Sequence, residues 1–268
     1  MKAIKLNENS AQHLFARQIG SGEPVLILHG LLGSSDNWTT IARDLADHYT
    51  VFSLDLRNHG RSFKSDHFDY PIMAEDERAF IQQHDLKKVS VIGHSMGGKV
   101  AMQLAFLYPE FLHKLVVVDI APKAYPPQNL QAVDALLNLD LTSVSRLSQA
   151  DEQLQQAIPD ASERLSHLKN LKRGPEGTYH WQVNLEAIRR SYEFISGAVT
   201  NGTYAKACLF VRGWKSDYIQ DADWDDVLEC FPLARLESIP NAGHWVHIQA
   251  RQLFVKTVLA FLNADETD

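Results

Sequence analysis

Residues 91–100, VIGHSMGGKV, change from a strand pattern to a helix pattern within a single turn. An apolar run precedes the turn, and apolar residues at helical spacing follow it in SMGGKVAMQLAFLYPE. Glycine weakens strands and helices by roughly 0.5 to 1 kcal/mol relative to alanine. Gly93 and Gly97 therefore indicate a turn that needs small residues on both sides of Ser95.

A Gly-x-Ser-x-Gly sequence between a strand and a helix is typical of a nucleophile elbow, in which a tight turn holds the serine in a strained backbone geometry. The pattern alone also describes an incidental serine in a glycine-rich turn, but its place between a strand and a helix favours a nucleophile. We therefore expect the Ser95 hydroxyl above the edge of the sheet, with the Met96 N–H pointing toward an oxyanion formed beside it.

The same rhythm of strand and helix extends along most of the chain. Apolar strand-like runs at PVLILHG, VFSLDL, KKVSVIG and KLVVVDIAP are separated by single amphipathic helices, which predicts βαβ units and a mainly parallel, doubly wound sheet. The rhythm stops after Pro122 and resumes at ACLFVRG. We expect an α/β core from residues 1–121 and 206–268, interrupted by a helical cap at residues 122–205.

A serine hydroxyl needs a histidine to accept its proton and a carboxylate to orient that histidine. In catalytic triads whose serine lies in an elbow, the serine comes first in the chain, the acid second and the histidine last. His244 is the favoured base, because it follows the turn after the last strand, whereas His247 would begin the final helix. His29 and His94 are interpreted as scaffold hydrogen-bonders, since both lie beside loops of other strands.

Two aspartates are candidates for the acid. Asp119 ends the strand LVVVD, and Asp217 follows the strand LFVRG within GWKSDY, so both would lie at the carboxyl edge of the sheet. Either residue could instead form a turn or cap a helix. The choice stays open on spacing alone.

An acyl-transfer site also needs a second oxyanion donor, expected directly after the first central strand. HGLLGS at residues 29–34 occupies that place, and the Leu31 amide is the candidate, with Gly30 and Gly33 allowing the loop its shape. We expect no metal and no cofactor. Cys208 and Cys230 form no CxxC pair and are interpreted as packing residues.

Charge and hydropathy limit the partners. A formal net charge of −7 argues against nucleic acid and anionic membranes as general partners. Neither a signal peptide nor a run of about 20 apolar residues is evident in the sequence, which predicts a cytoplasmic protein that acts on a small molecule.

Six segments, taken together, resemble one family. HGLLGSSDNW, DLRNHGRS, VIGHSMGGK, VVVDIAP, the W-x-x-N-L of residues 181–185 and PNAGHWVH resemble, in this order, the YbfF-type esterases of the α/β-hydrolase superfamily. The resemblance implies an α/β-hydrolase fold with a helical cap, a serine esterase acting on acyl esters, and Ser95, His244 and Asp119 as its triad. Where the family has a GGNS-like loop this chain has GWKSD, which keeps Asp217 as a substitute acid. The loop at residues 57–62, RNHGRS, is given a structural role.

We therefore expect hydrolysis of a carboxylic ester or thioester through an acyl-enzyme. The apolar stripes of the cap predict an apolar acyl part. An acyl-CoA thioesterase or a carbon–carbon-bond hydrolase on the same triad is the alternative among enzymes. A binding protein that keeps the hydrolase scaffold without turnover is the alternative from another class.

Overall fold

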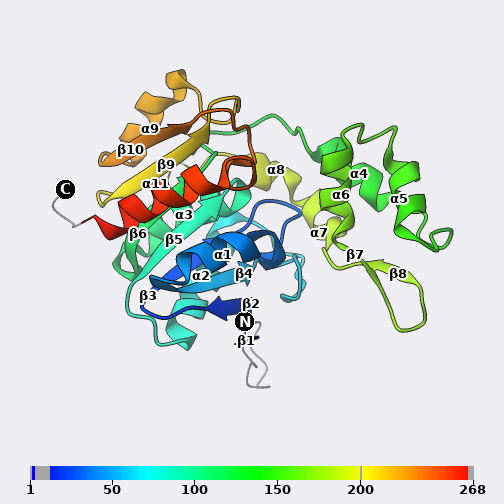
Figure 1. The fold of residues 1–268 in the computed structure, drawn as a ribbon. Helices are drawn as coiled ribbons and strands as arrows, with labels where there is room; N and C mark the ends of the chain where they lie inside the picture. Colours follow the sequence, from blue (N-terminus) through cyan, green and yellow to red (C-terminus); the bar gives the residue numbers. More distant parts are fainter. Residues whose placement is uncertain (1, 4–12, 200, 265–268) are drawn as a thin grey trace.

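The computed structural model describes residues 2–3, 13–199 and 201–264. Within these ranges one eight-stranded sheet forms the centre of the protein, in the order β1-β2-β4-β3-β5-β6-β9-β10 (Figure 1). The strands are β1 (Lys2–Ala3), β2 (Phe15–Ile19), β3 (Glu23–Leu28), β4 (Tyr49–Asp55), β5 (Val89–His94), β6 (Leu112–Val118), β9 (Cys208–Gly213) and β10 (Ala234–Ile239).

Every neighbouring pair from β4 to β10 is parallel, whereas β2 pairs antiparallel with β4 and β1 antiparallel with β2. The predicted mainly parallel α/β sheet is thus confirmed. A hairpin is also expected near the N-terminus; its two strands pair, and residues 4–12 between them lie outside the described residues. Because parallel strands end at the same edge, the residues that follow β3, β5, β6, β9 and β10 gather there.

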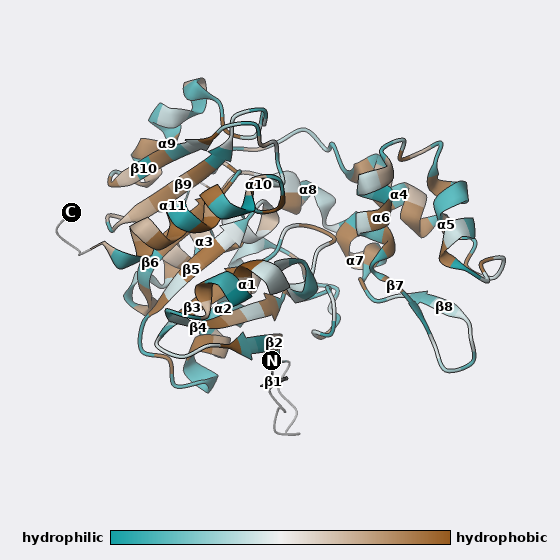
Figure 2. Ribbon diagram, in the orientation of Figure 1, coloured by the Kyte–Doolittle hydropathy of each residue, from teal (hydrophilic) through white to brown (hydrophobic). Residues whose placement is uncertain are grey.

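Helices cover both faces of the sheet, which explains why its central strands are apolar without interruption. Leu26 and Leu28 pack into the core beneath α2 (Tyr70–Gln83), α3 (Met96–Leu107) and α9 (Trp224–Cys230). Val25 and Ile27 face the other side, beneath α1 (Thr39–Leu45) and α11 (Arg251–Asn263). Figure 2 shows the brown, apolar strands enclosed between these helices. The short elements are η1 (Ser35–Trp38), η2 (Pro109–Phe111), η3 (Asp221–Asp223) and α10 (Val246–Gln249).

The segment 122–205 lies between β6 and β9 in the chain and beside the sheet in space (Figure 1). It contains the amphipathic helices expected there, together with a hairpin that periodicity does not reveal, because each of its strands has only three residues. A turn at residues 174–177, which Gly174, Pro175 and Gly177 favour, joins the two strands. The elements are α4 (Leu130–Leu137), α5 (Leu147–Leu154), α6 (Ala161–Leu168), β7 (Leu171–Arg173), β8 (Tyr179–Trp181), α7 (Leu185–Arg190) and α8 (Tyr192–Ser196).

The two ends of this segment are hydrogen-bonded to each other. The Val199 N–H donates to the Pro122 carbonyl at 2.6 Å, and the Tyr125 N–H donates to the Ser196 carbonyl at 2.8 Å. The segment therefore leaves and rejoins the core at neighbouring points.

As for membranes, the helices in the described ranges include none that is long and apolar enough to cross a bilayer.

Candidate active site

Ser95 lies between the end of β5 and the start of α3, with φ 53° and ψ −120°. A left-handed backbone of this kind costs a non-glycine residue about 1 to 3 kcal/mol and persists only where the surroundings enforce it. The neighbouring glycines supply the room: a Cβ on Gly93 would lie 2.3 Å from the Gly97 carbonyl oxygen, and one on Gly97 would lie 2.4 Å from that of Leu28. The strained turn predicted from the sequence is therefore present, and Met96 provides the first amide of the helix.

Asp119 and His244 are brought together at the same edge of the sheet. The His244 Nδ1 lies 2.8 Å from the Asp119 Oδ2, and the Asp119 side chain is fully buried. Asp119 itself follows β6 with φ 53°, so this residue too has a left-handed backbone. An Nδ1–H that donates to a carboxylate leaves Nε2 of the imidazole as the proton acceptor.

Two further donors hold the Asp119 carboxylate. The Gly213 N–H at the end of β9 donates to Oδ1 at 2.9 Å, and the Ser216 hydroxyl donates to Oδ2. The Tyr218 ring stacks on the His244 ring at 3.9 Å between centroids. Ser216 was missed by sequence reasoning, which considered the GWKSD loop only as the source of an alternative acid.

His94 links the elbow to the histidine loop. Its Nε2–H donates to the His244 carbonyl at 2.9 Å, and its ring centroid lies 4.6 Å from that of His244. Burial lowers the pKa of His94 well below its usual value, with the neighbouring His244 acting in the same direction. His94 is thus a neutral hydrogen-bonder that ties the backbone of His244 to the residue before Ser95.

The competing residues lie elsewhere. Asp217 is exposed at the rim, whereas the carboxylate that contacts His244 is that of Asp119. His247 stacks on Trp38 at 4.0 Å between centroids, and burial lowers its pKa to about 3. Both residues therefore lack the geometry of a triad member.

The loop after β3 lies against the serine. A Cβ on Gly30 would come within 3.3 Å of the Ser95 Cβ, and Leu31 lines the same cavity as Ser95 and Met96. Leu32 has φ 58° and is held on both sides: its N–H donates to His59 Nε2 at 3.1 Å, and its carbonyl accepts from Asn170 Nδ2 at 2.7 Å. These bonds set the orientation of the two peptide units on either side of Leu32, next to the unit that carries the Leu31 N–H.

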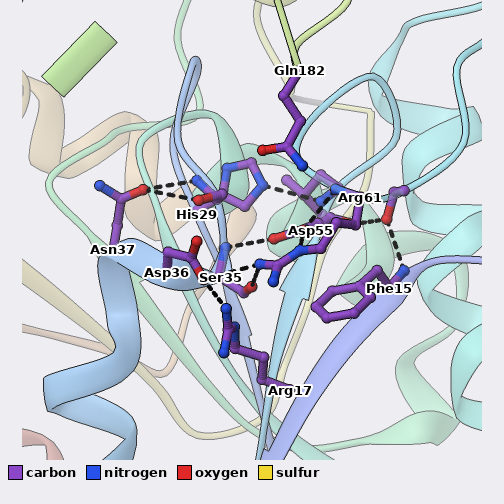
Figure 3. Close-up of polar contacts among 12 residues, drawn as sticks. Phe15, Arg17, His29, Ser35, Asp36, Asn37, Asp55, Arg61 and Gln182 are labelled. Atoms are coloured by element: carbon purple, nitrogen blue, oxygen red, sulfur yellow. Dashed lines mark hydrogen bonds and ion pairs between the residues drawn. The ribbon is translucent and has the colours of Figure 1, made fainter. Parts of the chain in front are cut away.

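The loop at residues 57–62 contacts the loop after β3 and helps to hold it in place. Figure 3 shows Arg61 between Asp55 and Asp36; Asp55 is fully buried and accepts the Ser35 N–H at 2.7 Å and the Arg61 N–H at 2.8 Å. Gly60 has φ 50°, and a Cβ there would overlap the Asp55 carboxylate. The structural role expected for the loop thus includes holding residues 32–35.

Histidines in this network are neutral. His29 Nε2 accepts the Leu56 N–H at 3.0 Å, and the His59 Nδ1–H donates to the Arg57 carbonyl at 2.9 Å. Burial lowers the pKa of His29, and burial together with the neighbouring His29 lowers the pKa of His59 well below its usual value. As expected from the sequence, His29 is a hydrogen-bonding part of the scaffold, and His59 of the loop at residues 57–62 is another.

Two cavities meet at the site. The inner one, of about 50 Å³, is lined by Ser95, Leu31 and Met96 from the core and by Asn129, Tyr192 and Ile195 from the 122–205 segment. The outer one, of about 220 Å³, is lined by His244 and Asp217, and both cavities include Tyr125 and Tyr218. Among the residues that the structure describes, no cluster of three or more histidine, cysteine or acidic side chains could hold a metal ion.

Comparison with known proteins shows which family this chain is similar to. A family described as "alpha/beta hydrolase fold" matches residues 23–207. A "Putative esterase/lipase" of Haemophilus influenzae is 36% identical, over 90% of this chain and 83% of its own length. The "Esterase YbfF" of Escherichia coli is 32% identical, over 91% of this chain and 94% of its own length.

Further relatives are similar in sequence and structure. An "sn-1-specific diacylglycerol lipase ABHD11" of Xenopus laevis is 36% identical, over 91% of this chain and 80% of its own length. A solved structure, "Marine microorganism esterase", is 39% identical with a TM-score of 0.91, and the match covers 94% of this chain and 100% of that one.

Proposed function

The chain belongs to the α/β-hydrolase fold family and is a carboxylic-ester hydrolase, and on that basis we propose that it works through an acyl-enzyme on Ser95. His244 is the base in this proposal and Asp119 the acid. The observation that carries the proposal is the 2.8 Å contact between Asp119 and the His244 Nδ1, beside a serine held in an elbow geometry.

In the first half-reaction the Ser95 oxygen attacks the ester carbonyl while Nε2 of His244 takes the hydroxyl proton. The amides of Leu31 and Met96 are the proposed donors to the oxyanion, where loss of one donor typically costs about 3 kcal/mol of transition-state stabilisation. His244 then protonates the departing alkoxide, which leaves the acyl group on Ser95.

Water completes the reaction by the same route in reverse. His244 deprotonates the water as it attacks the acyl-enzyme, and then returns the proton to the Ser95 oxygen as the acid leaves. The buried Asp119 carboxylate stabilises the imidazolium formed in both halves. The inner cavity is the proposed place of the acyl part, and the outer cavity beside His244 that of the leaving group.

We also propose that residues 122–205 act as a cap over this site. Support comes from the inner cavity, which Tyr192 and Ile195 of this segment line together with Ser95 of the core. Because the core and this segment both contribute residues to one small cavity, a substrate bound there would be enclosed between the core and the segment.

A fluorophosphonate probe tests the mechanism. We expect the wild-type protein to be labelled on Ser95, located by mass spectrometry, and Ser95→Ala to remain unlabelled and inactive toward aryl acetates. Equal labelling of the variant would reject Ser95 as nucleophile. An unlabelled, inactive wild-type protein would favour a binding protein without turnover.

The alternatives on the same triad differ in the bond that breaks. An aryl ester, the matching aryl thioester and an acyl-CoA with the same acyl group therefore form the comparison set. We expect the oxygen ester to have the highest kcat/KM; a higher value for acyl-CoA would reassign the protein as a thioesterase. Cleavage of a 1,3-diketone in preference to all three would indicate a carbon–carbon-bond hydrolase.

A further inference from the structure

A buried lysine lines the inner cavity together with Ser95. Lys99 lies four residues after Ser95 on α3, and only 1% of its surface is exposed. Four residues advance a helix by about 6 Å, and side chains on a helix lean toward its N-terminus. The Lys99 side chain therefore leans toward the serine end of the cavity.

The Lys99 ammonium has three N–H donors, and one of them donates to the Gly197 carbonyl. The ammonium also lies over the Tyr125 ring, 4.8 Å from its centroid, and 5.6 Å from the centroid of Tyr70. In the part of the chain that the structure describes, no carboxylate forms an ion pair with it. Burial lowers the pKa of Lys99 to about 7, because the charged form has lost its water.

Other buried cations in the protein are more fully satisfied. The Lys114 ammonium donates to three carbonyls, those of Phe261, Leu262 and Ala264. Arg57 is paired with Asp76 at 2.5 Å, and Arg164 with Asp151 at 2.8 Å. A buried cation without a carboxylate or a full set of acceptors is expensive, so Lys99 stands apart from this pattern.

Three tyrosine hydroxyls of the cavity wall take part in hydrogen bonds within the protein. The Tyr70 hydroxyl donates to the Ile195 carbonyl at 2.5 Å, and the Tyr125 hydroxyl donates to the Tyr218 carbonyl at 2.6 Å. The Tyr192 hydroxyl accepts the Asn129 N–H at 2.9 Å. Lys99 is thus the charged residue among those that line the cavity; it has donors left for a bound molecule, and its charge selects an anion.

The cavity limits the size of that molecule. Its volume of about 50 Å³ compares with the roughly 10 to 15 Å³ that one water needs. A chain of about four non-hydrogen atoms fills such a space, which agrees with the single helical turn between Ser95 and Lys99. An acyl group that starts at Ser95 would therefore end near the ammonium.

We propose that Lys99 binds the terminal carboxylate of the acyl part, so that the preferred substrates are monoesters of short dicarboxylic acids with about four or five carbons. This inference rests on the proposed function, because it assumes that the ester carbonyl lies at Ser95. It replaces the apolar acyl part expected from the cap stripes with a short chain that has an anionic end.

Matched esters test the proposal. Monoaryl succinate and monoaryl glutarate carry the carboxylate, and aryl pentanoate and aryl methyl glutarate are neutral partners of similar length. We expect the wild-type kcat/KM to favour the charged esters by about 10- to 100-fold, as for a hydrogen-bonded charge in a buried site.

In each variant the readout is the kcat/KM for the charged ester divided by the kcat/KM for its neutral partner. Lys99→Met keeps the aliphatic stem and removes the charge, and we expect its ratio to fall by about 10- to 100-fold. Lys206→Met is the matched control, since Lys206 donates to the Pro109 and Leu112 carbonyls and does not line the cavity; its ratio should equal that of the wild type. A wild-type protein that prefers the neutral esters, or a Lys99→Met ratio equal to the wild-type ratio, would overturn the proposal.

Binding gives a second readout that does not depend on turnover. Glutarate should raise the Tm of Ser95→Ala, and this shift should disappear in the double variant Ser95→Ala/Lys99→Met, with folding of both checked by circular dichroism. Absence of a shift in Ser95→Ala would also count against the proposal. Failure of the proposed function is distinguishable, because then no ester of either kind is cleaved while glutarate still binds.

Discussion

The two sides of the candidate site are held in different ways. On the acid–base side, the Asp119 carboxylate is bound by Gly213 and Ser216, both within or directly after β9 of the central sheet. On the oxyanion side, Leu32 is held by His59 from the loop at residues 57–62 and by Asn170 from the 122–205 segment. These contacts of the acid–base side come from strands and loops of the core, whereas the oxyanion side also depends on the position of the segment beside it.

This difference predicts that the two sides respond differently to amino-acid substitutions. Strand ends in a close-packed, hydrogen-bonded sheet move little relative to one another, so the acid–base side should fail mainly when a member of it is changed. A loop held by single hydrogen bonds from two other segments should respond to substitutions far from the reacting atoms. The predictions below run from the largest expected effect to the smallest.

The first prediction breaks the acid–base side. Asp119→Asn should lower kcat by about 10⁴-fold, because the amide cannot stabilise the imidazolium of His244. Asp217→Asn is the control and should stay within about threefold of the wild type, since an exposed rim charge contributes little. Steady-state kinetics on one aryl ester compare the two, and the reverse ranking would make Asp217 the acid.

The second prediction breaks the oxyanion side from a distance. Asn170→Ala removes the donor to the Leu32 carbonyl and should lower kcat by about 10- to 100-fold, because the Leu31 amide loses its alignment. The exposed Asn138 of the same segment, changed to alanine, should leave kcat unaltered. An unchanged kcat in Asn170→Ala would mean that the core alone fixes the loop.

The third prediction concerns pH and the histidine on the oxyanion side. Burial keeps His59 neutral in the folded protein, whereas the unfolded chain binds a proton below pH about 6.5. The unfolded state is therefore favoured as pH falls below that value, and His59 removes up to about 1.4 kcal/mol of unfolding free energy per pH unit.

His59→Gln cannot titrate, so its unfolding free energy should fall less steeply than that of the wild type between pH 6.5 and 5. Urea unfolding at pH 7.5, 6.0 and 5.0 measures the slopes. His180→Gln, a change of an exposed residue on β8, is the control and should keep the wild-type slope. Identical slopes in all three proteins would show that His59 is not the neutral group inferred from its burial.

The fourth prediction tests the redundancy of the acid–base side. Ser216→Ala removes one of the donors to Asp119, and the Gly213 N–H remains. We expect kcat to fall by only about three- to tenfold, because the lost donor is a neutral hydroxyl and the carboxylate keeps its contacts with the Gly213 N–H and His244. A loss larger than that of Asn170→Ala would invert the comparison between the two sides.

Local patterns in the sequence identify much of this site. Gly93 and Gly97 around Ser95 indicate the elbow, and the place of His244 after the last strand indicates the base. The choice between Asp119 and Asp217 could not be made from spacing, because both follow parallel strands that end at one edge. Their difference lies in burial and in the orientation of the loop after β9, which brings Ser216 and not Asp217 to the carboxylate.

Contacts over long sequence distances were beyond reach for a different reason. Asn170 binds Leu32 across 138 residues, and nothing near either residue marks the pair. Lys99 is hidden in a helix whose apolar stripe dominates its pattern, so its burial appears only when α2, α3 and the segment 122–205 are packed together. The mainly parallel sheet could be predicted because the strand and helix pattern repeats along the chain. A single long-range contact leaves no repeated pattern in the sequence.

The joined ends of the 122–205 segment have a consequence for the evolution of this scaffold. Because Pro122 and Val199 are hydrogen-bonded neighbours, the distance that any insertion must bridge is short and does not change with the insertion's length. A longer, shorter or unrelated segment can therefore be transplanted between these two points while β6 and β9 keep their pairing. Substrate choice can diversify through such exchanges while the Asp119 and His244 contact is kept, although a new segment must replace the hydrogen bond from Asn170 to Leu32.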